Sequence, residues 1–361
     1  MRITLFIGGL SGGGAERVTC SLATYLVNKN HDVEILTVSD EAPAYPLDKR
    51  VTRYSLTGKL FRKGLLRNFL RIIRFILYLM RRKCDAYVVL LPRTTFMLLN
   101  MRFLTKSKII AAQRIMPASL KPDVQKKLQK IAIKADAWVF QTKEQSDWFV
   151  PHIGESKTIV IPNAINPDFL NNVYNGDREK VIVSAGRMTK QKNQELLIKA
   201  FTAVHKDFPN YRLVIYGEGP FLQGLQETTK GLGLSKYISF PGYMTNVGQK
   251  IKNTSLFVLS SDYEGMPNAL MEAMALGLPC VSTDCDGGGA KYLIENEKNG
   301  LLVPKGDVDA LATAMEKMLS DRNFAECCGR EAHKICERLA PEKIYGEWES
   351  FIKEIAENNK Q

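Results

Sequence analysis

The feature that most constrains the fold of this chain is an alternation of apolar strand-like segments with helical ones, in two successive runs. The first run begins with RITLFIGGL (residues 2–10), continues with the helical segment 19–30 and returns to a strand at DVEILTVS (32–39). The second begins with KVIVSAGRM (180–188), followed by the helical segment 193–209 and the strand YRLVIYGEGP (211–220). Apolar strands joined by helices are typical of parallel sheets covered on both faces. The sequence therefore predicts an α/β fold with two Rossmann-like domains.

The domain boundary is predicted within residues 161–180, IPNAINPDFLNNVYNGDREK, a segment rich in Asn, Pro and Gly. The length of 361 residues also favours two domains, because one hydrophobic core rarely extends that far. We expect an N-terminal domain over 1–164, a C-terminal domain over 165–340, and a helix within 341–361 that packs back toward the N-terminal domain.

Composition predicts an ordinary soluble globular protein, with 45% hydrophobic and 24% charged residues. No stretch approaches the ~20 apolar residues that a membrane-spanning helix needs, and the first residues lack the pattern of a secretory signal. The seven cysteines form no paired framework, and the four histidines have no metal-binding spacing. We therefore expect a reduced, cytoplasmic compartment.

Two loops that follow predicted strands carry groups suited to phosphate. In SGGGAERV (11–18), Gly13 and Gly14 lie between a strand and a helix, where backbone N–H groups and the helix dipole favour an anion. In GRMTKQKN (186–193), Arg187 and Lys192 also lie between a strand and a helix, where they can contact phosphate oxygens. A tight glycine turn and a solvated loop would have the same compositions, so each motif alone leaves both interpretations open.

Two glutamates flank the start of an apolar helix in YEGMPNALMEAMALGLP (263–279). Eight helical residues span ~12 Å, which is longer than the ~5–9.5 Å between the carboxylates of a glycosidase. Glu264 and Glu272 therefore suit two separate hydroxyl-bearing groups, one on a sugar and one on a ribose. The alternative is an acid that stabilises the helix dipole, with an exposed glutamate behind it.

The same stretch places a proline at the start of the helix. Pro267 suits the first helical position, where no N–H is needed. The backbone N–H groups of Gly265, Met266 and Asn268 then remain available to a ligand. A divalent-cation site at Asp284 and Asp286 has little support, because the pattern is short and common and nearby cations supply the charge. We expect no metal.

Charge is distributed unevenly along the chain. Up to Val160 there are 27 Lys and Arg against 12 Asp and Glu, a net charge of +15, whereas the remainder has 23 against 26, a net charge of −3. The segment KLFRKGLLRNFLRIIRFILYLMRRK (59–83) has nine cations and no acid. Its helical stripe consists of Lys63, Arg67, Arg71, Arg74 and Arg81. Such a helix favours an anionic membrane surface or a phosphate-bearing lipid; the alternative is an ordinary helix with its apolar side in the core.

Together these motifs resemble the family 4 retaining glycosyltransferases, over nearly the whole chain. The resemblance rests on GGGAERV (12–18), GRMTKQKN (186–193), GEGP (217–220), EGMPNALMEAMALGLPCVST (264–283) and NGLLVP (299–304). It is strongest to bacterial enzymes of surface-polysaccharide and lipid-linked-oligosaccharide synthesis. It implies the GT-B fold, in which two Rossmann-like domains face each other across a cleft.

The resemblance also implies roles for individual residues. Glu264 and the amides after it would contact the transferred sugar, Glu272 the ribose, and Arg187 with Lys192 the diphosphate. The other donor-binding residues would be Gly13, Gly14, Gly217 and, near the base, Tyr243. The loop that often carries a sugar-contacting histidine in the family reads AAQRIMP (111–117) here, which leaves Arg114 as the candidate on the acceptor side. After GGGAK (287–291), Tyr292 stands where the family usually has an acid.

The implied activity is transfer of a hexose or N-acetylhexosamine, with retained anomeric configuration and without a metal or other cofactor. The donor would be a UDP-sugar. The acceptor would be a polyprenyl-diphosphate-linked or other membrane glycan, reached from the cytoplasmic face of the membrane. The alternatives are a nucleotide-sugar epimerase or hydrolase of the same fold, and a non-catalytic membrane-associated partner of another transferase. Nucleic-acid binding is not expected, because the basic helix belongs to no recognised module.

Overall fold

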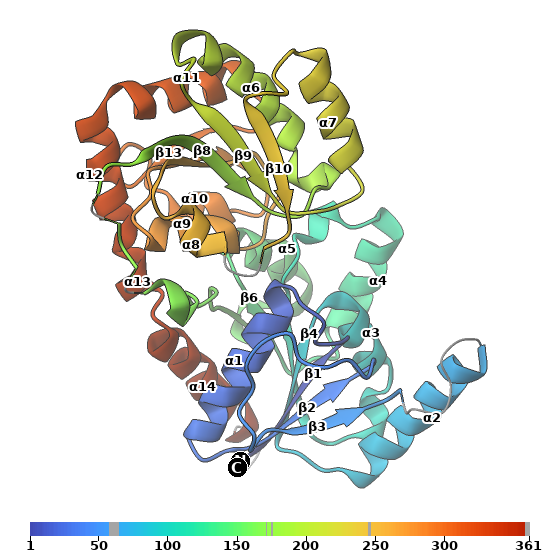
Figure 1. Ribbon diagram of the computed structural model, residues 1–361. Coiled ribbons are helices and arrows are strands. Elements are labelled where there is room, and N and C mark those ends of the chain that lie inside the picture. Colours follow the sequence, from blue (N-terminus) through green and yellow to red (C-terminus); the bar gives the residue numbers. More distant parts are fainter. Residues whose placement is uncertain (58–64, 171, 175, 245–246, 358–361) are drawn as a thin grey trace. The chain divides into compact units, whose positions relative to one another are not determined.

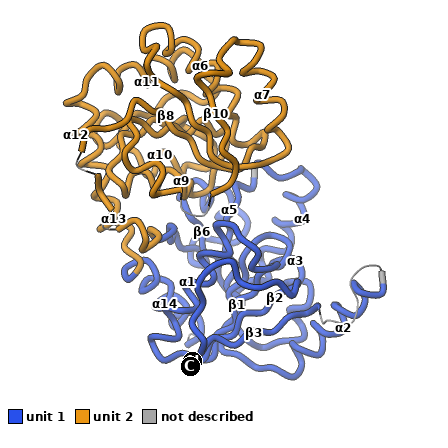
Figure 2. Tube along the Cα trace, in the orientation of Figure 1, with its two compact units in different colours: residues 1–164, 342–361 blue, residues 165–341 orange. Residues whose placement is uncertain are grey.

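The computed structural model describes residues 1–57, 65–170, 172–174, 176–244 and 247–357 (Figure 1). The chain forms two compact units, which are coloured separately in Figure 2. Unit 1 comprises residues 1–164 and 342–361, and unit 2 comprises residues 165–341. The chain therefore passes from unit 1 to unit 2 after Ala164 and returns at Glu342.

Unit 1 is built on a seven-stranded parallel sheet with the order β3-β2-β1-β4-β5-β6-β7. Its strands are β1 (Arg2–Ile7), β2 (Asp32–Thr37), β3 (Thr52–Ser55), β4 (Ala86–Leu90), β5 (Lys108–Ala112), β6 (Ala137–Phe140) and β7 (Thr158–Val160). Every residue of β4 and β6 is buried, which explains why these strands read as continuous apolar runs.

Helices join these strands and pack on the sheet. They are α1 (Gly14–Asn28), α2 (Leu65–Arg81), α3 (Pro92–Asn100), α4 (Pro122–Ala132) and α5 (Lys143–Ile153). Trp138 and Phe140 of β6 pack against Phe149 of α5, with ring centroids 4.8 and 4.9 Å from that of Phe149. The strand order changes direction between β1 and β4, so ligand-binding loops are expected where these two strands end.

The C-terminal helix α14 (Pro341–Glu357) packs on unit 1 through residues far away in the sequence. His31 Nε2 lies 3.0 Å from Glu349 Oε1, and Lys29 Nζ donates to Glu342 Oε1 at 2.7 Å. Trp348 and Ile352 are fully buried. These contacts make α14 part of the core of unit 1 rather than a tail of unit 2.

Unit 2 contains a six-stranded parallel sheet with the order β10-β9-β8-β11-β12-β13. Its strands are β8 (Glu179–Ala185), β9 (Arg212–Tyr216), β10 (Ile238–Gly242), β11 (Thr254–Leu259), β12 (Cys280–Asp284) and β13 (Leu301–Pro304). The two parallel sheets confirm the predicted α/β fold class. From β8 the chain continues to β9 on one side, and from β11 to β12 on the other, so the order reverses between β8 and β11.

The helices of unit 2 bury their apolar stripes against this sheet. They are α6 (Gln194–Asp207), α7 (Leu222–Gly231), α8 (Val247–Ile251), α9 (Asn268–Ala275), α10 (Gly289–Leu293), α11 (Val308–Ser320), α12 (Arg322–His333) and α13 (Ile335–Arg338). In α6, Leu197, Phe201 and Val204 recur at helical spacing and are fully buried. This core holds the ends of β8 and β11 in place.

Candidate active site

The candidate site of unit 2 lies where β8 and β11 end, at the reversal of the strand order. Open α/β sheets bind ligands at this position, beyond the carboxyl ends of the strands. Arg187 and Lys192 lie in the loop after β8, and Glu264 lies in the loop after β11. The topology therefore brings together three residues that the sequence analysis selected from separate segments.

A buried ion pair joins the two loops. Lys192 Nζ donates to Glu264 Oε1, and only 7% of Glu264 is exposed. Ser261 Oγ donates to the same carboxylate oxygen at 2.8 Å. Gln191 Nε2 lies 3.4 Å from Glu264 Oε2 and donates to the Tyr263 carbonyl at 2.9 Å. Both oxygens of Glu264 therefore have donors, and the carboxylate is held in one orientation.

Sequence reasoning missed the residues that fix these loops. Asn193 Nδ2 donates to Asp262 Oδ1 at 2.8 Å, and the Asp262 amide donates to the Gln191 carbonyl at 2.8 Å. The amide of Glu264 donates to the Asp286 carbonyl at 2.8 Å. The side chain of Asp286 pairs with Lys305 Nζ at 2.6 Å, which places this candidate metal ligand in an ion pair instead. Over the described residues, no group of three or more His, Cys, Asp or Glu side chains is arranged to hold a metal ion.

Glycine allows the backbone of these loops to pack closely. A Cβ atom on Gly289 would lie 1.8 Å from the Gly265 carbonyl oxygen, and one on Gly217 would lie 2.0 Å from that of Gly186. Gly217 also has φ +132°, which side-chain-bearing residues rarely adopt. These two contacts bring the loops after β9 and β12 against the loops that carry Arg187 and Glu264.

The segment after Glu264 presents backbone amides at the start of α9. Among the hydrogen bonds of the described residues, none has the N–H of Gly265 or Met266 as its donor. The prediction for Pro267 was wrong by one position: Pro267 is the N-cap, with ψ 94°, and Asn268 is the first helical residue. An extended ψ at Pro267 delays the helix by one residue. Glu272 lies within α9 and is half-buried.

The other donor-side residues follow neighbouring strands at the same edge of the sheet. Gly217 follows β9, and Tyr243 follows β10 with an exposed side chain and an amide that donates to Glu218 Oε1 at 3.4 Å. Arg187 is exposed, and none of the ion pairs among the described residues includes its guanidinium. This exposed cation, in the loop that also carries Lys192, is available to a charged ligand.

One thiol adjoins this site but is not reactive. Burial, together with the negative charge of Glu264, raises the pKa of Cys285 to about 12. Its thiol is therefore protonated at neutral pH, and a protonated thiol is a weak nucleophile.

In unit 1 the predicted glycine loop follows β1. Gly13 is the N-cap of α1, and Gly14 is the first residue of that helix. The Gly13 amide donates to the Tyr45 hydroxyl at 3.2 Å, so one of the amides expected to meet a phosphate already has an acceptor. Arg114 follows β5, and its Nη1 donates to Asn163 Oδ1 at 2.7 Å.

The basic stripe lies on α2, except for Lys63, which is outside the described residues. Arg71 and Arg74 are half-buried, Arg81 is exposed, and Arg71 Nε donates to Thr57 Oγ1 at 2.6 Å. The inward face of α2 contributes Phe75, Tyr78 and Leu79 to the core.

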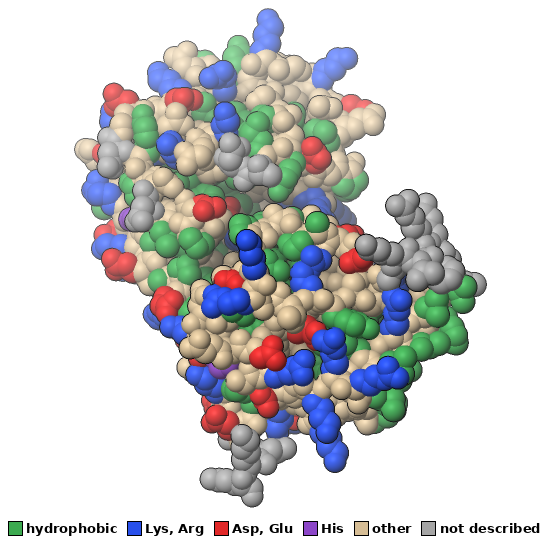
Figure 3. Space-filling view, turned by 60° about the horizontal axis from the view of Figure 1, so that its bottom comes forward, with side chains coloured by type: hydrophobic (Ala, Val, Ile, Leu, Met, Phe, Trp, Pro, Cys, Tyr) green, Lys and Arg blue, Asp and Glu red, His purple; other side chains and the backbone are tan. Residues whose placement is uncertain are grey.

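The rest of the apolar surface of α2 faces solvent. Phe69 is 60% exposed and Met80 is 62% exposed. The further exposed apolar residues of this helix are Leu66, Ile72, Ile73 and Leu77. Hydrophobic side chains gather with lysines and arginines at the right of Figure 3, where α2 lies. Among the described residues, no helix is long and apolar enough to cross a membrane.

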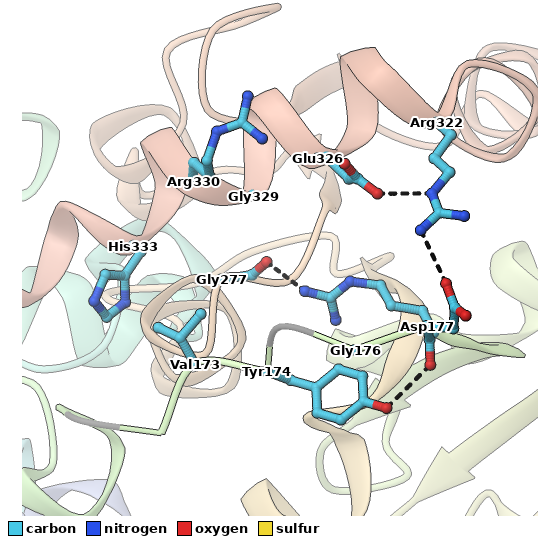
Figure 4. A pocket seen from close by; sticks show the side chains of 11 residues that line it. Val173, Tyr174, Gly176, Asp177, Gly277, Arg322, Glu326, Gly329, Arg330 and His333 are labelled. Atoms are coloured by element: carbon cyan, nitrogen blue, oxygen red, sulfur yellow. Dashed lines mark hydrogen bonds and ion pairs between the residues drawn. The ribbon is translucent and has the colours of Figure 1, made fainter.

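A cavity of about 580 Å³ lies at the opposite edge of the unit 2 sheet (Figure 4). Several of its lining side chains already have partners: Arg322 pairs with Asp177 and Glu326, and Arg178 donates to the carbonyls of Gly277, Lys252 and Thr254. Lys252 and Thr254 stand at the beginning of β11, so this cavity is separate from the loops that carry Glu264.

Comparison with known families identifies both units. The model described as Glycosyltransferase Family 4 matches residues 12–169, and the model described as Glycosyl transferases group 1 matches residues 169–335. Together the two matches span residues 12–335 without a gap.

Two curated relatives match along nearly the whole chain. A Campylobacter jejuni α-1,4-N-acetyl-D-galactosaminyltransferase named for a GalNAc-containing diNAcBac-PP-undecaprenol is 27% identical, over 98% of this chain and 99% of its own. An exopolysaccharide phosphotransferase of Streptomyces coelicolor is 29% identical over 98% of this chain, which spans 41% of the length of that relative.

Solved structures show the same fold. Anabaena HepE, solved with UDP and glucose, superposes with a TM-score of 0.79 at 17% identity, covering 98% of this chain and 100% of its own. Staphylococcus aureus TarM, in a complex that includes UDP, gives a TM-score of 0.81 at 15% identity, covering 97% and 99%. The chain therefore belongs to the family 4 type of glycosyltransferases with the GT-B fold.

Proposed function

We propose that this glycosyltransferase moves a hexose or N-acetylhexosamine from a UDP-sugar to a lipid-linked glycan, with retention of the anomeric configuration. The observation that carries this proposal is the buried Lys192–Glu264 pair where β8 and β11 end, with Arg187 in the same loop as Lys192. The pair combines a cation suited to a diphosphate with a carboxylate suited to sugar hydroxyls. HepE, of the same fold, was solved with UDP and glucose.

The leaving diphosphate is the group that most needs stabilisation. Arg187 and Lys192 supply positive charge as the bond to the sugar breaks, and preorganised charges of this kind are a large part of catalysis. These two cations stand in for the metal ion that other nucleotide-sugar enzymes use, so we propose that no metal or cofactor is needed. Glu272 accepts hydrogen bonds from the ribose.

The sugar itself is oriented by the loop after β11. The amides of Gly265 and Met266 donate to its hydroxyl groups, and Glu264 accepts from them. Glu264 is already held by Lys192 and Ser261, and the Cys285 thiol is protonated, so neither acts as a covalent nucleophile. The acceptor hydroxyl then attacks the anomeric carbon from the same face that the diphosphate leaves. The anomeric configuration is therefore retained.

We propose that the enzyme meets its acceptor at a membrane surface. The exposed apolar face of α2 and its arginines suit the headgroup region of an anionic bilayer. An open groove of about 500 Å³ in unit 1 is lined by Pro92, Phe96, Met97 and Val124, together with Arg93. The positive charge of Arg93 is close enough to act on Arg71. An apolar groove beside arginines suits a prenyl chain with its diphosphate. The Campylobacter relative is named for such a lipid, and we place the chain on the cytoplasmic face.

The test is transfer from a panel of UDP-, GDP- and ADP-sugars to a short synthetic glycan on polyprenyl diphosphate. We expect one UDP-sugar to give a product whose anomeric proton coupling matches that of the donor. Inversion of that coupling would refute the retaining mechanism. Equal release of UDP with and without acceptor would favour the hydrolase alternative, and UDP binding without turnover on any acceptor would favour a non-catalytic partner.

A further inference from the structure

Arg114 is a cation that unit 1 holds without a counter-charge. It follows β5, and its Nη1 contacts the neutral amide oxygen of Asn163. The guanidinium carbon lies 5.5 Å from the centre of the Trp348 ring. None of the ion pairs among the described residues includes Arg114. Burial lowers the pKa of Arg114 to about 10, because the protein interior solvates the charged form poorly.

The surroundings of this cation contain donors without acceptors. Nε and Nη2 of Arg114 are buried and have no hydrogen-bond partner, and the same holds for Nε1 of Trp348. A buried donor left unpaired costs about 1–3 kcal/mol, and more when the group is charged. Three such nitrogens on two side chains in contact cost stability that nothing in the packing of unit 1 returns, which favours a ligand over a purely structural role.

The position of Arg114 favours a ligand. Arg114, Gln141 and Asn163 follow β5, β6 and β7, which are neighbours in the sheet, so all three lie at its carboxyl edge. This is the edge where parallel sheets bind ligands. The side-chain amide of Gln141 lies 2.8 Å from Asn163 Oδ1 and so packs against the amide that positions Arg114. Arg114 taken as a whole residue is half-buried, whereas its Nε and Nη2 atoms are buried.

We propose that Arg114, with the Trp348 indole N–H, binds an oxyanion, a carboxylate or a phosphate, carried by a sugar substrate. An oxyanion supplies both missing elements, negative charge and several acceptor atoms, whereas a hydroxyl or a water molecule supplies acceptors alone. The planar guanidinium can bind such a group through two parallel hydrogen bonds. This inference rests on the proposed function only in taking the ligand to be a sugar substrate. The oxyanion belongs either to the donor sugar, as in a uronic acid, or to the acceptor.

The experiment detects binding at Arg114 and Trp348 directly and does not require turnover. The chain has three tryptophans, so its ¹H–¹⁵N spectrum has three indole signals, and Trp348→Phe identifies the one from Trp348. The protein is titrated with UDP-glucose and UDP-glucuronate, which differ by one carboxylate, and with matched acceptor glycans with and without a phosphate. Inorganic phosphate is the probe for the oxyanion alone.

We expect the Trp348 signal to shift downfield with the oxyanion-bearing member of one pair and not with its neutral twin. The pair that responds identifies the donor or the acceptor as the source. Arg114→Gln should abolish this shift and weaken binding of the charged twin by about tenfold or more, with the neutral twin changed by less than about twofold. Arg114→Lys, which keeps the charge, should retain part of the preference.

Folding of the variants is checked by urea unfolding. Arg114→Gln removes an unpaired buried charge, so its midpoint should equal or exceed that of the parent. If no probe moves the Trp348 signal, or if charged and neutral twins shift it equally in the parent and in Arg114→Gln, Arg114 only packs against α14 and the inference is wrong. A shift without any transferase activity would refute the proposed function and leave the oxyanion site standing.

Discussion

The contacts of Glu264 show what one carboxylate needs in order to stay charged in a nearly closed environment. Removing a carboxylate from water is costly unless its oxygens receive hydrogen bonds. Lys192 and Ser261 both donate to Oε1, and Gln191 approaches Oε2. An apolar pair of similar size would fold at least as well in many proteins, so the retention of two charges here points to the ligand rather than to stability.

The first prediction concerns Lys192. Lys192→Ala should lower kcat/KM by about 10²–10³-fold, because a positive charge is lost where the leaving diphosphate gains negative charge. The exposed Lys190, in the same short loop, provides the matched control. Lys190→Ala should change kcat/KM by roughly twofold or less, as surface substitutions away from a site usually do.

Steady-state transfer assays and circular dichroism check this pair of variants. The Lys192→Ala protein should keep its helical signal, since Ser261 and Gln191 still donate to the Glu264 carboxylate. Near-parental transfer by Lys192→Ala, or equal losses in both variants, would remove the role assigned to Lys192.

The second prediction uses two glycines of unit 2 that differ in their surroundings. A Cβ on Gly289 would meet the Gly265 carbonyl at 1.8 Å, whereas one on Gly224 would have nothing within 4 Å. Gly289→Ala should lower the free energy of unfolding by about 1–3 kcal/mol through overpacking. Gly224→Ala, within α7, should raise it by about 0.5–1 kcal/mol, because alanine favours the helix.

Urea unfolding measures both changes, and the transfer assay adds a second readout. Gly289→Ala should also reduce kcat/KM, because the displaced Gly265 carries an amide proposed to contact the sugar. A Gly289→Ala protein as stable and active as Gly224→Ala would show that this loop does not depend on the close contact.

At the scale of elements, sequence pattern predicted the sheets better than the contacts between loops. Alternating apolar segments predicted parallel strands, and the rule that loops after strands meet at one edge predicted that the loop of Arg187 and Lys192 lies near the loop of Glu264. Lys192 and Glu264 are 72 residues apart, and no sequence spacing encodes that Ser261 and Gln191 share the same carboxylate. The helix was predicted to start at Pro267 but starts one residue later, at Asn268, because Pro267 has an extended ψ that its residue type does not fix.

Helix α2 illustrates another limit of periodicity. The spacing of its arginines predicted a basic stripe, but a helical pattern does not say which apolar residues find a partner. The structure places Phe75 and Leu79 in the core and leaves Phe69 and Met80 exposed. Only tertiary packing separates these two sets.

The third prediction tests that exposed face. Phe69→Asp should weaken binding to vesicles that contain anionic phosphatidylglycerol by about tenfold or more, since burying a phenylalanine contributes about 1.5–3 kcal/mol. Phe221→Asp is the control, because Phe221 is also exposed but lies in unit 2. Its effect on vesicle binding should be small.

Vesicle sedimentation at low and high salt gives the measurement. Binding of the parent should fall as salt rises, because salt screens the arginines of α2. If Phe69→Asp and Phe221→Asp sediment alike, or if neutral phosphatidylcholine vesicles bind as well as anionic ones, α2 is not the membrane-binding element.

At the scale of the whole molecule, the chain leaves unit 1 after Ala164 and returns at Glu342. The two crossing segments lie side by side, since the Ile165 amide donates to the Leu339 carbonyl at 3.0 Å. The return brings α14 into unit 1, where Trp348 and Ile352 are fully buried. Unit 1 is therefore incomplete until the last part of the chain has been made, whereas unit 2 is continuous in sequence.

The fourth prediction follows from this order. A chain that ends at residue 340 lacks α14, and loss of a buried tryptophan alone costs about 3–5 kcal/mol, out of the 5–15 kcal/mol that typically stabilises a domain. We expect its unit 2 to stay folded and its unit 1 to unfold. A chain that ends at residue 357 keeps α14 and serves as the control. Hydrogen exchange should show protection of β8–β13 in both chains and protection of β1–β7 in the longer one alone. Retained protection of β1–β7 in the shorter chain would mean that α14 covers unit 1 without supporting it, and joint loss in both units would mean that they fold as one cooperative body.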